Sequence, residues 1–88
     1  MSQPAVTVYV SDWCPYCSRA KDLLARKSVA VNEINVDDEV KFREEMLARS
    51  NRRTVPQIFI GEKHVGGCDD LFALEESGEL DRLIQGAG

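Results

Sequence analysis

Short runs of β-branched and aromatic residues alternate along the chain with stretches whose apolar residues recur at helical spacing. Residues 5–10 (Ala-Val-Thr-Val-Tyr-Val) and 31–36 (Val-Asn-Glu-Ile-Asn-Val) are typical of short strands. Between them, one apolar face follows Pro15, and proline is tolerated at the first position of a helix. The pattern predicts a strand, a helix that begins at Pro15 with Cys14 as its N-cap, and a second strand.

A second helix and a hairpin are expected next. Asp37 or Asp38 can cap a helix that runs to about Ser50 and keeps apolar residues one turn apart on its inner side. Residues 57–60 and 63–65 have the composition of strands, and the glycine between them suits a tight turn. The middle of the chain therefore adds a helix and two paired strands.

The last part of the chain is expected to be helical. After Gly66-Gly67, Asp69 or Asp70 can cap a helix over residues 70–77, and a short helix over 79–85 can follow. The order is β-α-β-α-β-β-α with this further helix, and a helix between two strands allows them to pair in parallel. We expect residues 1–88 to form a single α/β domain with a four-stranded mixed sheet flanked by helices.

Composition narrows the classes of function. The chain has 88 residues, 43% of them hydrophobic, and a net charge of −4, which argues against nucleic acid as a partner. It contains no apolar stretch of membrane-spanning length and no pattern of a secretory signal, so we expect no membrane partner and a cytoplasmic location. In that reducing compartment, three cysteines, an odd number, argue against structural disulfides.

Two of the cysteines form the motif Cys14-Pro15-Tyr16-Cys17 at the predicted start of the first helix. The first turn of a helix offers unpaired N–H groups and a positive dipole end, and both favour a thiolate, the attacking species in thiol–disulfide exchange. Cys17 lies one helical turn further, within reach of Cys14. The position predicts a redox pair in which Cys14 is the nucleophile and Cys17 the resolving thiol.

Metal binding is an alternative role for the same side chains. Cys14, Cys17, His64 and Cys68 provide a Cys3His set for zinc, and the thiols are also candidate ligands of an iron–sulfur cluster. Pro15 at a helix start suits a redox pair better than a closed tetrahedral site. We expect His64 to be an exposed residue of an edge strand, and we expect no bound metal.

Three motifs together resemble the dithiol glutaredoxins of the bacterial type: Cys14 to Cys17, Thr54-Val55-Pro56, and Gly66-Gly67-Cys68-Asp69-Asp70. The match runs over nearly the whole chain. The resemblance implies a thioredoxin fold, glutathione as co-substrate without a tightly bound cofactor, and reduction of protein–glutathione mixed disulfides and protein disulfides by a monomer. Within that family, iron–sulfur binding belongs mostly to members with Cys-Gly-Phe-Ser, which differs from the motif here.

The resemblance also implies a glutathione groove. Pro56 is expected to be a cis-proline, so that the Val55 backbone can pair with the extended tripeptide. The γ-glutamyl end is expected at the first N–H groups of the third helix, with the Asp70 side chain on its amino group. The expected groove residues are Tyr16, Arg52, Thr54, Val55, Pro56, Gly67, Cys68, Asp69 and Asp70, with Trp13 and Tyr16 as an apolar rim.

One position departs from the family pattern. Many glutaredoxins have a lysine three residues before the first active-site cysteine, and this chain has Ser11 there, followed by Asp12. Arg52 and Arg53 are the nearest candidates to replace that cation, and we expect Arg52 to bind the glycyl carboxylate. Asp12 would oppose the thiolate if its carboxylate pointed inward.

Cys68 has two interpretations. A free cysteine packs as a small hydrophobic residue, and its backbone function at a helix start does not require the sulfur. Alternatively, Cys68 is an exposed thiol beside the groove that can be glutathionylated. We expect the thiol to be dispensable for turnover.

Overall fold

Strands and helices follow one another in the order expected from the sequence in the computed structural model, which describes residues 4–86. The elements are β1 (Val6–Val10), α1 (Pro15–Arg26), β2 (Val31–Asn35), α2 (Val40–Ser50), β3 (Gln57–Ile60), β4 (Lys63–Gly66), α3 (Cys68–Ser77) and α4 (Glu79–Gln85). The additional helix over residues 79–85 is confirmed. Among the described residues, no helix has both the length and the apolar character needed to cross a membrane.

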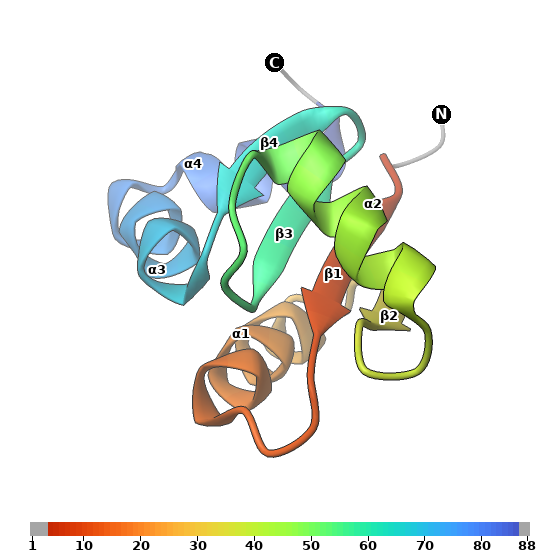
Figure 1. Cartoon of the computed structure of the whole chain (residues 1–88). Coiled ribbons are helices and arrows are strands. Elements are labelled where there is room, and N and C mark those ends of the chain that lie inside the picture. Colours follow the sequence, from red (N-terminus) through yellow and green to blue (C-terminus); the bar gives the residue numbers. More distant parts are fainter. Residues whose placement is uncertain (1–3, 87–88) are drawn as a thin grey trace.

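The four strands form one mixed sheet in the order β2-β1-β3-β4 (Figure 1). β1 and β2 are parallel, with Val6 opposite Val31, because α1 carries the chain back to the starting edge. β3 runs antiparallel to β1 and to β4, with Val8 opposite Ile58. The predicted four-stranded mixed sheet flanked by helices is therefore confirmed.

Successive side chains of a strand point to opposite faces of the sheet, so the buried core is divided between these two faces. Val8 packs on one face with residues of α1, α3 and α4, whereas its neighbour Tyr9 packs on the other face with Met46 of α2. Figure 1 shows α2 lying across one side of the sheet and α1 on the opposite side. The larger of the two buried clusters is the one beneath α1, so the helix that carries the cysteine pair rests on the main core.

Two predicted helix starts are corrected by the structure. α2 begins at Val40 with Glu39 in the N-cap position, and neither Asp37 nor Asp38 caps it. The Asp37 carboxylate instead accepts hydrogen bonds from the backbone N–H of Asp12 and from Arg43. α3 begins at Cys68 rather than residue 70, because Gly67 is its N-cap and Asp70 lies within the first turn.

We predict that Leu24→Ala lowers the free energy of unfolding by about 2–5 kcal/mol, because Leu24 is fully buried between α1 and the sheet and its removal leaves a cavity. Val40→Ala is the control, since Val40 is an exposed apolar side chain, and its effect should stay within about 0.5 kcal/mol. Urea unfolding followed by circular dichroism measures both values. Equal effects of the two substitutions would contradict the assigned core.

Candidate active site

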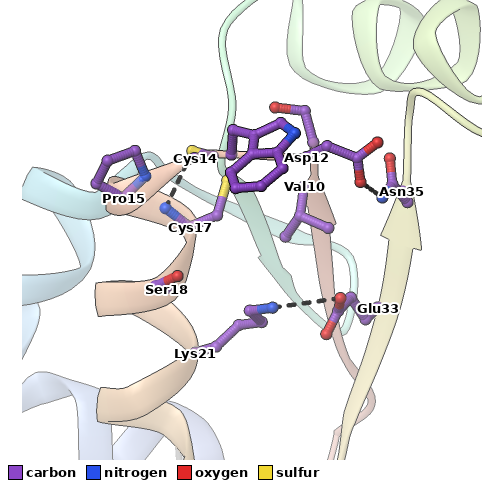
Figure 2. Close-up of a pocket in the computed structure, with 11 residues that line it drawn as sticks. Val10, Asp12, Cys14, Pro15, Cys17, Ser18, Lys21, Glu33 and Asn35 are labelled. Atoms are coloured by element: carbon purple, nitrogen blue, oxygen red, sulfur yellow. Dashed lines mark hydrogen bonds and ion pairs between the residues drawn. The ribbon is translucent and has the colours of Figure 1, made fainter.

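Cys14 occupies the N-cap of α1, directly after the loop that leaves β1 (Figure 2). The backbone N–H of Cys17 donates a hydrogen bond to Cys14 Sγ at 3.1 Å. On the other side, Cys14 Sγ lies 3.9 Å from the carbonyl oxygen of Val55. The sulfur therefore receives a backbone donor from the first turn of α1 and lies beside the loop that carries Val55.

The second cysteine of the motif lies in a different environment. Cys17 is 2% exposed, on the inner side of α1, whereas Cys14 is half-buried at its end. Burial, followed by the proximity of Cys14, raises the pKa of the Cys17 thiol to about 12. Both cysteines are free thiols in the structure. The structure therefore places the partly exposed Cys14 at the end of α1 and the buried, protonated Cys17 thiol one turn further along the helix.

The residues expected to bind the tripeptide line one hollow next to the active-site helix. These are Tyr16, Arg52, Thr54, Val55, Pro56, Gly67, Cys68, Asp69 and Asp70, which together we call the groove. The peptide bond between Val55 and Pro56 is cis, as expected from the resemblance. The groove thus brings together the end of α1, the loop before β3 and the start of α3.

Asp70 is held in the groove by two donors. Its Oδ2 accepts hydrogen bonds from the Gly67 N–H at 2.9 Å and from Arg52 Nη1 at 3.2 Å. The Gly67 N–H and the Arg52 guanidinium both lower the pKa of the Asp70 carboxyl, with the backbone bond as the larger cause. Gly66 has a φ of 119°, and a Cβ at this residue would lie 2.2 Å from Asp70 Oδ2. The glycine therefore makes room for the carboxylate.

A buried polar pair behind the groove was missed by the sequence analysis. Gln57 is fully buried at the start of β3, where its Nε2 donates to the carbonyl oxygen and the hydroxyl of Thr54 at 2.9 and 3.2 Å. Its Oε1 lies 2.7 Å from His64 Nε2. The sequence feature that could have indicated this pair is a glutamine in an otherwise apolar strand. The pair fixes the loop that carries Val55.

The prediction that His64 is an exposed strand residue is wrong. Its ring is half-buried and stacks on Phe59, with 4.9 Å between ring centroids. Burial, and then the positive charge of Arg52, lower the pKa of His64. His64 lies opposite Phe59 in the β3–β4 pair, and Gln57, two residues before Phe59, is on the same face of the sheet, so the ring meets both side chains.

Three further residues considered from the sequence lie outside the groove. Trp13 is not part of the groove and lines a separate hollow, so only Tyr16 of the expected apolar rim contributes to the groove. The Asp12 carboxylate accepts a hydrogen bond from Asn35 Nδ2 of β2 at 2.9 Å (Figure 2). It therefore points toward the neighbouring strand. Arg53 does not line the groove, whereas Arg52 does.

The zinc set considered from the sequence is not assembled. Across residues 4–86, no three His, Cys, Asp or Glu side chains come together in a group that could hold a metal ion. Cys68 is 7% exposed, and burial raises the pKa of its thiol. Its side chain is thus a small buried apolar group, as in the first of its two interpretations, while its backbone begins α3.

Comparisons with known proteins identify the family of the chain and agree with its fold. The model of the family described as Glutaredoxin matches residues 6–65. The chain belongs to the glutaredoxin family. It is 54% identical over 81 residues to a glutaredoxin of Pseudomonas aeruginosa, a match that spans 92% of this chain and 96% of that protein.

Solved glutaredoxin structures have the same fold. The solution structure of glutaredoxin from Brucella melitensis superposes with a TM-score of 0.87 at 52% identity, covering 100% of this chain and 96% of that one. A crystal structure of a buckwheat glutaredoxin–glutathione complex superposes with a TM-score of 0.86 at 32% identity, covering 97% and 80%. The thioredoxin fold is thereby confirmed, and this glutaredoxin belongs to a family of thiol–disulfide oxidoreductases.

We predict that iodoacetamide at pH 7 alkylates Cys14 well before the other two cysteines, because Cys14 is accessible whereas Cys17 and Cys68 are buried and have raised thiol pKa values. Peptide mass spectrometry at increasing times measures the order. The urea-unfolded protein, in which all three thiols react, is the control. Simultaneous labelling of Cys14 and Cys17 in the folded protein would contradict the proposed difference between them.

Proposed function

We propose that this glutaredoxin reduces protein–glutathione mixed disulfides and protein disulfides, with glutathione as the electron donor. The observation that carries the proposal is the position of Cys14 Sγ, which receives the Cys17 N–H and faces the Val55 carbonyl beside the groove. The crystal structure of the buckwheat relative, a glutaredoxin–glutathione complex, supports the choice of tripeptide. We further propose that the protein acts as a cytoplasmic monomer.

The first reaction requires only Cys14. Its thiolate attacks the glutathione sulfur of a protein–glutathione disulfide; the S–S bond breaks, and the target leaves as a thiolate that takes up a proton. A second glutathione thiolate then attacks the Cys14–glutathione disulfide, which releases oxidised glutathione and restores the Cys14 thiolate. The net change is one mixed disulfide and one glutathione converted into one protein thiol and one oxidised glutathione.

The second reaction also uses Cys17. Cys14 attacks a protein disulfide and forms a mixed disulfide with the target. Cys17 then loses its proton, attacks Cys14 Sγ and releases the second target thiol, which leaves a Cys14–Cys17 disulfide. Two glutathione molecules reduce that disulfide and leave as oxidised glutathione. The raised pKa of Cys17 keeps its thiol protonated near neutral pH, so the resolving step is expected to accelerate as the pH rises toward that pKa.

The groove supplies complementary groups for the tripeptide. The Val55 backbone can pair with the cysteinyl residue of glutathione, as a strand pairs with an edge. The first N–H groups of α3 can receive the γ-glutamyl carboxylate, and Asp70 can accept the amino group. These contacts would hold the glutathione sulfur next to Cys14.

In the structure Arg52 pairs with Asp70, which affects the prediction that Arg52 binds the glycyl carboxylate. Arg52 Nη1 lies 3.2 Å from Asp70 Oδ2, although the two residues were expected to bind opposite ends of the tripeptide. Both side chains are about half exposed, and an exposed ion pair contributes little free energy. We propose that Arg52 leaves Asp70 when glutathione binds and pairs with the glycyl carboxylate, which frees Asp70 for the amino group.

We predict that Cys14→Ser abolishes glutathione-dependent reduction of every disulfide substrate, because it removes the nucleophile. Cys17→Ser should retain reduction of a glutathionylated peptide and lose reduction of a protein disulfide, since only the second reaction needs a resolving thiol. Consumption of NADPH by added glutathione reductase measures both activities. Wild-type rates in Cys14→Ser would refute the assignment, and Cys68→Ser, in which the buried third thiol is replaced, is the matched control.

We predict that Arg52→Ala raises the KM for glutathione about tenfold, which corresponds to the loss of one charge-assisted contact. The same substitution should leave the KM for γ-glutamylcysteine nearly unchanged relative to wild type, because that dipeptide lacks the glycyl carboxylate. Arg53→Ala, outside the groove, is the control. An equal effect of Arg52→Ala on both thiols would place Arg52 at another part of the ligand.

A further inference from the structure

Two exposed aromatic side chains flank the nucleophile. Trp13 is 98% exposed and Tyr16 is 56% exposed, and Val40 at 76% is the third large apolar side chain with such exposure in the described part of the chain. Tyr16 lines the groove, whereas Trp13 lines a second hollow between α1 and the β2 edge of the sheet. The two aromatic side chains therefore lie on different sides of Cys14.

The loop that carries Trp13 is anchored at its base while the indole is left in water. The backbone N–H of Asp12 donates to Asp37 Oδ2 at 2.9 Å, and the Asp12 carboxylate accepts from Asn35. Trp13 itself has a φ of 58°, a left-handed conformation that is uncommon for a bulky residue. Trp13 lines the same hollow as Cys14 and Cys17. The structure thus holds a large apolar side chain next to the reacting sulfur without burying it.

Negative side chains outnumber positive ones around this hollow. Asp12, Lys21 and Glu33 line it, and Lys21 Nζ pairs with Glu33 Oε2 at 3.3 Å. The hydrogen-bond partner of the Asp12 carboxylate, Asn35, is neutral, so the Asp12 charge is not offset by that contact. The hollow therefore has a net negative charge beside an apolar ring, which is complementary to a segment with an apolar and a basic side chain.

We propose that Trp13 and Asp12 form a docking surface for the substrate protein. This inference rests on the proposed function, in which the glutathione half of a mixed disulfide fills the groove on the Tyr16 side. The protein half then lies toward the side of Cys14 that glutathione leaves open, where the indole and the Asp12 carboxylate are. An apolar side chain near the target cysteine packs on Trp13, and a lysine or arginine faces Asp12. Buried tryptophans contribute strongly to such interfaces.

The test compares three glutathionylated substrates. One is a peptide with leucine and arginine beside its cysteine, the second is the same peptide with glycine and serine in their place, and the third is the mixed disulfide of glutathione and 2-mercaptoethanol. Trp13→Asn removes the indole, and asparagine tolerates the left-handed backbone of this position. We expect it to lower kcat/KM about tenfold for the first peptide and to leave the small disulfide within about twofold of wild type.

Matched variants separate the contributions. Trp13→Phe keeps an aromatic ring and should retain most of the preference for the first peptide. Asp12→Asn should lower kcat/KM for that peptide about threefold at low salt and have no effect at high salt, because exposed charges are screened. Val40→Ala, which lies outside both hollows, should change none of the three rates. The urea midpoint of each variant checks that folding is unaffected.

A binding measurement gives an independent result. Trp13 is the only tryptophan of the chain. In Cys14→Ser, which cannot react, the emission of Trp13 should shift to shorter wavelength when the leucine–arginine peptide is added, because the indole leaves water. The glycine–serine peptide should produce a smaller shift.

Each outcome decides between the possibilities. If wild type does not turn over the small disulfide, the proposed function fails, whatever Trp13 does. If wild type is active and Trp13→Asn changes all three rates equally, or none, the docking surface is refuted while the proposed function stands. If sedimentation shows self-association that Trp13→Asn abolishes, the indole binds a second copy of the chain, and the inference is overturned.

Discussion

The hydrogen bond from the Cys17 N–H to Cys14 Sγ is the contact on which the active site depends. It exists because β1 ends just before the motif and Pro15 begins α1, so that Cys14 falls on the N-cap with the open N–H groups of the first turn below it. The same helical turn places Cys17 against the core. One short segment thus provides a partly exposed sulfur, a backbone donor to that sulfur, and a buried second thiol.

The groove depends on a different set of contacts, which are made by side chains at the start of β3 and the start of α3. Gln57 fixes the Thr54 loop from below, and Asp70 fastens the start of α3 to Gly67 and Arg52. The absence of a side chain at Gly66 makes the second of these possible. The nucleophile is therefore positioned by a helix terminus, whereas the shape of the groove is fixed by side-chain contacts. The two parts of the site meet at the Val55 carbonyl.

Local patterns in the sequence predicted the parts of the structure that depend on local physics. Strand and helix positions followed from apolar spacing, and the N-cap position of Cys14 followed from Pro15 at the helix start. The groove residues came from the resemblance rather than from spacing. The failures involve side-chain contacts within the folded chain: Asp37 does not cap α2 because the Asp12 N–H and Arg43 bind its carboxylate, and His64 is half-buried because it meets Phe59 and Gln57 across the β3–β4 hairpin. The spacing of apolar residues does not indicate such partners.

The chain has Ser11 where many glutaredoxins have a lysine, and the separation between the nucleophile and the groove explains how that lysine can be absent. The cations near the two cysteines already have carboxylate partners, since Lys21 pairs with Glu33 and Arg52 with Asp70. The hydrogen bond that reaches Cys14 Sγ comes from the backbone of α1, and no side-chain replacement at position 11 removes it. The charged side chains lie on two sides of this contact: Arg52 and Asp70 line the groove, and Asp12 lines the second hollow. A contact made by the backbone is retained when the surrounding side-chain charges change, and we propose that those charges select the disulfides that reach the sulfur.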